Sequence, residues 1–193
     1  GFANGKIFEF DSSLDLVRSD SIGNLEVKSF HPRNEGETWI RSSGGIFRWT
    51  LNGVEKIQKF NTRSLDFSES KPDELAICNN NGWFLLDANS YTEVLFGDKR
   101  ILFPEVNNPS QCYCLKYDTE GTLWISASDG IFRKIGEKLE RFRAIESLTN
   151  YSTIEQILPS IKGPVYFATV GNGLVAFYKG TVVRITTANG LES

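Results

Sequence analysis

Short stretches in which apolar and polar residues alternate, separated by glycine, aspartate and asparagine, recur along most of this chain. The clearest run reads CYCLKYD at 112–118, TLWISA at 122–127, IFRKIG at 131–136 and LERFRAI at 139–145. Alternation with a period of two predicts β-strands, and the dipeptide Asp129-Gly130 favours the tight turn of a hairpin. The pattern therefore predicts an antiparallel meander of four short strands, the fourth over residues 139–145.

Part of this run occurs twice in the chain. Residues 35–48 read EGETWIRSSGGIFR and residues 120–133 read EGTLWISASDGIFR, and the two align without a gap. The corresponding residues Trp39 and Trp124 are 85 positions apart. Half of that distance falls in the repeat length of β-propeller blades, about 40–50 residues, so an intermediate copy is expected near residue 80.

Weaker copies lie at the expected distances. They read PDELAICNNNGWFLLD at 72–87 and GPVYFATVGNGLVAFYKG at 163–180, and NGKIFEF at 4–10 resembles the second half of a copy. Each copy has a glycine at the corresponding turn, with successive spacings of 40, 37, 48 and 43 residues: Gly5, Gly45, Gly82, Gly130 and Gly173.

These repeats predict the fold. A single meander cannot bury both faces of its sheet, so the copies must stack side by side, and four-stranded units stacked around an axis form a β-propeller. We therefore expect an all-β fold, a single partial propeller of about four to five blades, with Trp39, Trp124 and Tyr166 packed between adjacent blades. The expected limits are a half blade over 1–18 and blades over approximately 25–60, 64–97, 112–145 and 154–187.

The composition is that of a folded globular region. Of 193 residues, 40% are hydrophobic and 23% are charged, and no apolar run approaches the roughly 20 residues of a membrane span. The net charge of −3 provides no basic footprint for nucleic acid. The chain begins at Gly1 and contains no methionine, so we expect it to be a piece of a longer protein.

Cysteine and histidine are too few and too scattered to predict a metal centre or a cofactor site. Cys112 and Cys114 are two residues apart, which places them on one face of a strand and badly for a disulfide. Cys78 lies far away in sequence, and the chain has no C-x-x-C pair. Without such a pair a zinc site is not predicted, and we expect small buried side chains.

The sequence likewise predicts no enzyme in this chain. The only histidine, His31, precedes Pro32 in an expected turn, so no Ser–His or Cys–His pair is available. Glu35 and Glu37 are expected to be exposed turn residues rather than an acid–base pair. The D-x-E-G segment at 118–121 lacks the further oxygen ligands of a calcium loop, and an aspartate that caps its own turn explains it.

A binding surface remains as the candidate for function. In a propeller, the turns between second and third strands and the links between blades gather at one end, and here these segments are rich in Asn, Ser and Thr. Neutral donors and acceptors suit a polar ligand such as an oligosaccharide, although turns have this composition for conformational reasons as well. The candidate ligand contacts are Arg41, Asn80, Asn81, Asn107, Asn108, Ser128, Asp129, Tyr151 and Asn172.

The repeat also carries a family resemblance. LKYDTEGTLWISASDGIFRK at 115–134 resembles the D-x-x-G-x-L-W-I-x-T-x-x-G-I/L-x-R pattern of the two-component regulator propeller repeat. SGGIFRWTLNGVEKI at 43–57 and GNGLVAFYKGTVVRITTANGLES at 171–193 resemble its continuation. The resemblance extends over about residues 25–193 and is weakest at 64–87, where Ala76 replaces the tryptophan. Arg33 also stands where the family has aspartate, so we expect that turn to be held differently.

The resemblance implies a role in signalling. Such repeats occur in the periplasmic sensor regions of hybrid two-component proteins of Bacteroidetes, in which a membrane helix and a histidine kinase follow the propeller. It implies a membrane-anchored, homodimeric parent protein that responds to a glycan. A lectin-like or protein-interaction propeller without a kinase partner is the alternative. Because family propellers have about seven blades, a partner copy could complete the ring, or the chain could form an open arc or a smaller ring.

Overall fold

The computed structural model describes residues 4–34, 36–58, 62–68, 71–80, 82–89, 93–97, 111–149 and 152–191. By its internal contacts the chain divides into two compact units, Gly1–Thr62 and Arg63–Ser193. Each unit is built from antiparallel sheets.

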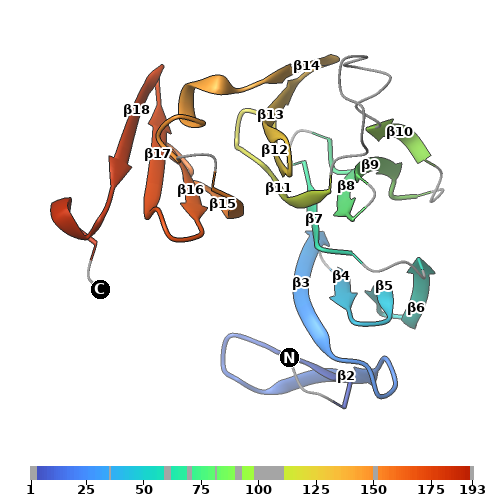
Figure 1. The fold of residues 1–193 in the computed structure, drawn as a ribbon. Coiled ribbons are helices and arrows are strands. Elements are labelled where there is room, and N and C mark those ends of the chain that lie inside the picture. Colours follow the sequence, from blue (N-terminus) through green and yellow to red (C-terminus); the bar gives the residue numbers. More distant parts are fainter. Residues whose placement is uncertain are drawn as a thin grey trace. The chain divides into compact units, whose positions relative to one another are not determined.

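The first unit contains a two-stranded and a four-stranded sheet, drawn in blue to teal in Figure 1. In the two-stranded sheet, β1 (Lys6–Phe10) pairs with β2 (Leu16–Ser21). The four-stranded sheet consists in order of β3 (Val27–Asn34), β4 (Glu37–Ser42), β5 (Gly45–Thr50) and β6 (Gly53–Gln58). Buried apolar side chains of both sheets form one cluster: Ile7, Ile22, Val27, Ile40, Phe47 and Trp49.

The second unit contains three four-stranded sheets. The first consists of β7 (Ser64–Phe67), β8 (Glu74–Asn79), β9 (Gly82–Asp87) and β10 (Glu93–Gly97). The second consists of β11 (Cys112–Tyr117), β12 (Leu123–Ala127), β13 (Gly130–Ile135) and β14 (Lys138–Arg141). The third consists of β15 (Ile154–Pro159), β16 (Val165–Thr169), β17 (Leu174–Tyr178) and β18 (Thr181–Ile185).

Each four-stranded sheet is a meander whose strands follow one another in chain order. The predicted all-β fold of repeated four-stranded sheets, resembling propeller blades, is confirmed. Gly45, Gly82 and Gly130 each open the third strand of a sheet opposite the last residue of the second, with φ between 121° and 141°. L residues rarely adopt this conformation, which explains why a glycine recurs at this turn.

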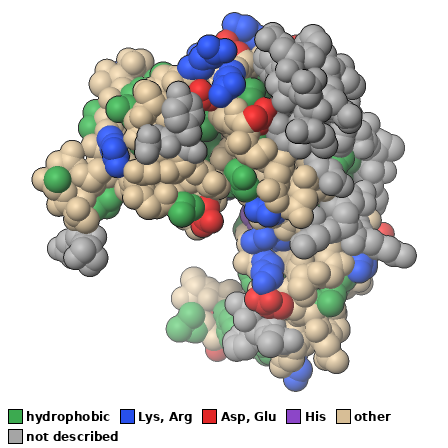
Figure 2. Space-filling model, in the orientation of Figure 1, with side chains coloured by type: hydrophobic (Ala, Val, Ile, Leu, Met, Phe, Trp, Pro, Cys, Tyr) green, Lys and Arg blue, Asp and Glu red, His purple; other side chains and the backbone are tan. Residues whose placement is uncertain are grey.

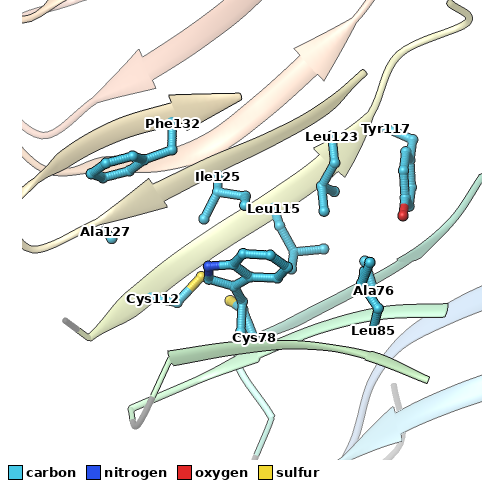
Figure 3. Close-up of a cluster of buried hydrophobic side chains, with 11 residues drawn as sticks. Ala76, Cys78, Leu85, Cys112, Leu115, Tyr117, Leu123, Ile125, Ala127 and Phe132 are labelled. Atoms are coloured by element: carbon cyan, nitrogen blue, oxygen red, sulfur yellow. The ribbon is translucent and has the colours of Figure 1, made fainter. Parts of the chain in front are cut away.

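Within the second unit, neighbouring sheets pack face to face. Figure 3 shows side chains of β8 and β9 meeting those of β11, β12 and β13, and all of them are at least nine-tenths buried. The cluster consists of Ala76, Cys78, Trp83, Leu85, Cys112, Leu115, Tyr117, Leu123, Ile125, Ala127 and Phe132. Burial of this apolar area is the main stabilising term that holds one sheet on the next.

The other face of the β11–β14 sheet packs against the β15–β18 sheet around Trp124. The Trp124 ring meets the rings of Phe142, Phe167 and Phe177 edge-on, at centroid distances of 5.1, 5.4 and 5.7 Å. Such edge-to-face pairs add to the hydrophobic contribution. Tyr166 alternates with Phe167 along β16, so its side chain lies on the opposite face of that sheet, where it is partly exposed.

An ion pair with a buried carboxylate also connects the first two sheets of the second unit. Asp66 Oδ1 accepts a hydrogen bond from Lys116 Nζ at 2.5 Å, and Asp66 Oδ2 accepts one from the backbone N–H of Tyr117 at 2.8 Å. Burial raises the pKa of Asp66, although the Lys116 ammonium acts in the opposite direction. The Tyr117 hydroxyl donates to Glu74 Oε1 at 2.7 Å, so both sheets share this polar contact.

The two neighbouring cysteines do not share a face, contrary to the sequence prediction. The pairing of β11 with β12 shifts register between Cys112 and Cys114, and the two side chains belong to the cores on opposite faces of the sheet. The same irregularity occurs at the start of β3 and of β15. A β-bulge inserts one residue and so reverses the alternation of faces, which a strict period of two cannot anticipate.

The predicted fourth strand over 139–145 is too long. β14 ends at Arg141, and Arg143–Ile145 form a short 3₁₀ helix. Phe142 turns inward onto Trp124, and Ile145 is completely buried. Apolar burial at this point outweighs continuation of an edge strand, so the chain leaves the sheet four residues earlier than the alternation suggests.

The predictions for residues 31–37 also need correction. His31 and Pro32 lie inside β3 rather than in a turn, and the Nε2 atom of His31 is 2.8 Å from the Ser29 hydroxyl. Glu37 is buried, not exposed, whereas Glu35 lies outside the described residues. The burial of Glu37 goes with its hydrogen bond to the tryptophan of this sheet.

In the β11–β14 sheet, Asp118 bonds its own turn and the tryptophan. Asp118 Oδ1 accepts from the N–H groups of Glu120 and Thr122 at 3.0 and 2.9 Å, and Asp118 Oδ2 accepts from Trp124 Nε1 at 2.8 Å. The D-x-E-G segment is therefore a turn closed by its aspartate. The buried indole N–H is satisfied by the same carboxylate.

In the β3–β6 sheet, where Arg33 replaces that aspartate, Glu37 takes over the role. Glu37 Oε1 accepts from Trp39 Nε1 at 2.8 Å and from Arg33 Nη1 at 2.9 Å, and Glu37 Oε2 accepts from Arg48 Nη2 at 3.0 Å. Burial by itself would raise the pKa of Glu37, but the bonds from Arg48, Arg33 and Trp39 hold it below its usual value. The tryptophan of this sheet is therefore held by a glutamate within β4, whereas Trp124 is held by the aspartate of its preceding turn.

Candidate ligand-binding site

The meander topology divides the loops of the second unit between two ends. Turns between second and third strands and links from one sheet to the next lie at one end, which we call the link end. Turns between first and second and between third and fourth strands lie at the other, which we call the hairpin end. Of the candidate ligand contacts inferred from the sequence, four belong to described link-end segments of this unit: Asn80, Ser128, Asp129 and Asn172.

A pocket of about 170 Å³ opens at the link end of the β11–β14 sheet. Its wall combines the β12–β13 turn with the link that leads from β14 to β15. Serine and threonine hydroxyls, one tyrosine and three charged side chains face it. The polar residues that line the pocket are Tyr113, Ser126, Ser128, Asp129, Arg141, Glu146, Thr149, Ser152 and Thr153.

An ion pair closes one side of this pocket. Arg141 Nε donates to Glu146 Oε1 at 2.7 Å, and the Glu146 side chain is largely buried. Both groups lie against the backbone of Gly130, where a Cβ atom would come within 2.5 Å of Glu146 Oε1 and 3.0 Å of Arg141 Nε. The repeated glycine therefore leaves room for the ion pair, in addition to forming the turn.

The link itself is held by its own hydrogen bonds. The Thr149 hydroxyl donates to the Glu146 carbonyl at 2.9 Å, and the Thr149 N–H donates to the Ile145 carbonyl at 3.0 Å. Further along, the Ser152 N–H donates to the Thr149 carbonyl at 3.0 Å. These bonds fix the backbone that carries Ser152 and Thr153. A ligand that binds to a backbone already fixed loses less free energy to ordering it.

On one side, the pocket continues into polar contacts with the β7–β10 sheet. Asn80 Oδ1 accepts from Arg63 Nε at 2.7 Å and from Gln111 Nε2 at 3.0 Å. The Gln111 carbonyl in turn accepts from the Ser128 N–H at 2.8 Å. The Arg63 guanidinium lies 5.4 Å from the centroid of the Tyr113 ring, a cation–π contact that orients a wall of the pocket.

On the other side, the pocket continues into the β15–β18 sheet through Asn172. Asn172 Nδ2 donates to the Ser152 hydroxyl, and Asn172 Oδ1 accepts from Arg184 Nη2 at 3.1 Å. Arg184 Nε also donates to the Asn172 carbonyl, at 3.0 Å. Polar side chains of three consecutive sheets therefore lie along the link end.

The structure thus brings together part of the predicted set. Ser128 and Asp129 line one pocket, and Asn80 and Asn172 lie at its two flanks through the contacts above. Arg41 belongs to the first unit, where its Nε donates to the Ser29 hydroxyl and its Nη1 donates to the Thr62 carbonyl, at 3.1 Å each. The other four predicted contacts lie outside the described residues: Asn81, Asn107, Asn108 and Tyr151.

Sequence reasoning missed Tyr113, Arg141 and Glu146. Tyr113 is the bulge residue between the two cysteines, and a bulge re-aims a side chain that strand alternation assigns elsewhere. Arg141 ends β14 and Glu146 follows the 3₁₀ helix, so both were hidden by the prediction of a longer strand. The charge of Glu146 in the otherwise neutral segment 146–153 was the one available signal.

The described residues contain no cluster of His, Cys, Asp and Glu that could hold a metal ion. In the described part of the chain, no helix is both long and apolar enough to span a membrane. On the face drawn in Figure 2, acidic and basic side chains lie beside one another where β14 runs. This agrees with the Arg133–Glu140 and Lys138–Glu140 ion pairs.

Comparison with known proteins supports the fold assignment. The chain matches no protein-family model and no curated protein sequence. It is similar in structure to the extracellular domain of the putative hybrid two-component system BT3049 from Bacteroides thetaiotaomicron, with a TM-score of 0.69 and 15% identity over 93% of this chain. It is also similar to the extracellular domain of BT4673, a putative hybrid two-component system of that organism, with a TM-score of 0.66 and 13% identity over 98% of this chain.

A chain of the mitotic checkpoint complex is similar to a comparable degree, with a TM-score of 0.64 and 15% identity over 97% of this chain. The present chain spans 26% of each of the two Bacteroides chains and 62% of the checkpoint chain. At identities this low, the structural similarity establishes a shared fold and nothing more. The chain is a β-propeller-like protein that resembles extracellular domains of two-component systems and also propellers of other function.

Proposed function

We propose that this chain is part of the periplasmic sensor region of a membrane-anchored hybrid two-component protein, and that its link end binds one residue of an oligosaccharide. The role is binding rather than catalysis. The likeness in fold to the BT3049 and BT4673 extracellular domains supports the sensor role. A bound ligand would act by favouring one of two arrangements of a homodimeric parent, since it shifts an equilibrium only through its difference in affinity.

The observation that carries the proposal is the link-end pocket itself. It combines a tyrosine ring, two hydroxyl-bearing segments and the Arg141–Glu146 pair on a backbone held by its own hydrogen bonds. Sugar hydroxyls require such paired donors and acceptors, and an aromatic ring offers a face for the apolar side of a sugar ring. At about 170 Å³ it is smaller than the roughly 300–1,000 Å³ of pockets that enclose larger ligands, so it suits a single terminal residue.

A direct test is isothermal titration of the chain with tetrasaccharides prepared from xylan, mannan, homogalacturonan and chondroitin. We expect binding of at least one of them, and a loss of affinity of about tenfold in Tyr113→Ala and in Asp129→Asn, which corresponds to about 1.4 kcal/mol. Glu137→Gln is the matched control, because Glu137 is exposed at the hairpin end. The oligosaccharide site would be refuted if none of the four tetrasaccharides bound. It would also be refuted if Tyr113→Ala and Asp129→Asn bound the saccharide as tightly as the control Glu137→Gln.

A protein-interaction propeller is the second candidate. The similarity to a chain of a multiprotein complex favours it, since the fold match is almost as good as that to the two-component domains. It predicts no saccharide binding at the link end. Sedimentation equilibrium with and without the tetrasaccharides also distinguishes the two proposed functions. The sensor role predicts that the chain dimerises to a different extent when the saccharide is bound.

A further inference from the structure

A larger hollow lies at the hairpin end of the second unit, between the β11–β14 and β15–β18 sheets. It has a volume of about 520 Å³, and its walls come from the end of β13 and from the turns that follow β11, β15 and β17. Trp124 and Phe177 line it from within the core. Its size falls inside the range of roughly 300–1,000 Å³ that is typical of ligand pockets. By topology it is at the opposite end from the oligosaccharide site.

Large apolar side chains around this hollow are exposed to solvent. Ile161 is 80% exposed, Ile135 is 49% exposed and Tyr178 is 42% exposed, and all three line the hollow. Single exposed apolar residues are common on protein surfaces, but a group of them rimming one concavity marks an interaction site. The first part of the binding chemistry is therefore aliphatic and aromatic.

The second part of the binding chemistry is basic. Arg133 and Asp118 also line the hollow, but they are engaged, Arg133 with Glu140 and Asp118 with its turn and Trp124. Lys162 forms no ion pair or hydrogen bond with any described residue. Among the described residues, the ammonium group of Lys179 has one such partner, the Tyr178 ring, with 5.2 Å between Nζ and the ring centroid. Among the described rim residues, Glu120 is the one acidic side chain with no such contact, so two lysines stand against one glutamate as charges that can pair with a ligand.

The backbone at Lys179 is a third observation. Lys179 has φ of 47°, in the left-handed region, and it precedes Gly180 in the tight turn between β17 and β18. Asparagine or glycine is the usual residue in that conformation. A lysine at this position places an ammonium group at the rim although the backbone conformation is unfavourable for its side chain. Such backbone outliers often accompany functional positions.

From these observations we infer that the hairpin-end hollow docks an extended peptide segment of a separate protein, one in which bulky apolar side chains alternate with acidic ones. Apolar side chains of the segment enter the hollow over Ile135, Ile161 and Tyr178. Its carboxylates pair with Lys162 and Lys179. This inference does not depend on the oligosaccharide site, which lies at the other end of the sheets.

A peptide fits this surface better than an anionic saccharide does. Ile135 and Ile161 are aliphatic and offer no hydrogen bond to the hydroxyl groups that cover a sugar, and burying those hydroxyls unpaired is unfavourable. Apolar peptide side chains release water from the same surface without that loss. Carboxylates placed between them meet the two lysines and provide orientation.

The test uses fluorescence anisotropy with the full chain and a labelled nine-residue peptide in which leucine and phenylalanine alternate with glutamate. Two matched peptides replace every glutamate by glutamine or every apolar residue by serine. The variants are Ile161→Ser, Lys162→Glu and Lys179→Glu, all at exposed positions. Arg143→Glu is the control for charge reversal, since Arg143 is an exposed cation near the link end.

We expect the glutamate peptide to bind and each of the three variants to weaken it about fivefold or more, with Arg143→Glu and Tyr113→Ala within about twofold of the parent chain. Both substituted peptides should bind more weakly than the glutamate peptide, and added salt should lower the affinity of the glutamate peptide. The proposal is overturned if the peptide does not bind, if the glutamine peptide binds equally, or if the variants match the control. It is also overturned if a homogalacturonan tetrasaccharide binds there in place of the peptide, or if the same variants abolish self-association of the chain instead.

Discussion

The Asp118–Trp124 contact makes the clearest test of how one sheet of this protein is stabilised. Trp124 is 2% exposed, and its indole N–H donates to Asp118 Oδ2 at 2.8 Å. Asp118 Oδ1 meanwhile accepts from the N–H groups of Glu120 and Thr122. Replacing Asp118 by alanine therefore leaves a buried donor without a partner and opens the turn.

The expected cost follows from these contacts. An unsatisfied buried N–H costs about 1–3 kcal/mol, and bonds to a charged acceptor contribute more than neutral ones. We expect Asp118→Ala to lower the free energy of unfolding by about 2–4 kcal/mol. Trp124→Phe removes the donor but keeps an aromatic ring in the core, and it should lower the free energy of unfolding by about 1–3 kcal/mol. The double variant should be more stable than the sum predicts, by about 1–2 kcal/mol.

The assay is urea denaturation followed by far-ultraviolet circular dichroism. With a slope of about 2 kcal/mol per molar urea, Asp118→Ala should shift the midpoint down by about 1–2 M. Asp118→Asn, which keeps one acceptor oxygen, should fall between the parent chain and the alanine variant. If the two single effects add within about 0.5 kcal/mol, the carboxylate does not act through the indole and the reasoning is wrong.

Three further predictions concern other parts of the fold. Gly130→Ala should destabilise the chain by about 2–3 kcal/mol, because φ is 141° and the new Cβ would displace the Glu146 carboxylate. Gly136→Ala, with φ of 55° and no atom within 4 Å of the new Cβ, should cost only about 1 kcal/mol, and equal urea midpoints would contradict this. Because the pKa of Glu37 is lowered in the folded state, its stabilisation is present above the usual value of 4.5 and is lost as pH falls through the folded value. Glu37→Gln should therefore flatten the acid limb of a stability–pH curve, and an unchanged limb would exclude this role. Finally, the three cysteines are buried, and burial raises the pKa of the Cys114 thiol. Ellman's reagent should react with them only after denaturation, so rapid reaction with the native chain would count against the packing described here.

Much of the fold was accessible from the sequence because the determining signals are local. Alternation over five or six residues, a glycine that permits positive φ, and recurrence of the whole pattern predicted strands, turns and four-stranded sheets. The β12–β13 turn with Ser128 and Asp129 was predicted as part of a binding surface for the same reason. Turn chemistry and strand order alone assign those residues to the link end.

The tertiary structure decided what lies on which face and which groups meet. A bulge at Tyr113 reversed the faces of the two cysteines, and burial of Phe142 and Ile145 ended β14 early. Glu37 replaced the missing aspartate beside Trp39 because two arginines from other parts of the sheet neutralise it. None of these outcomes can be read from spacing, since each depends on the competition between apolar burial, satisfaction of buried polar groups and strand pairing among residues far apart in the chain. The sequence by itself determined the repeated sheet, whereas only the packing of one sheet on the next decided the pocket at the link end and the hollow at the hairpin end.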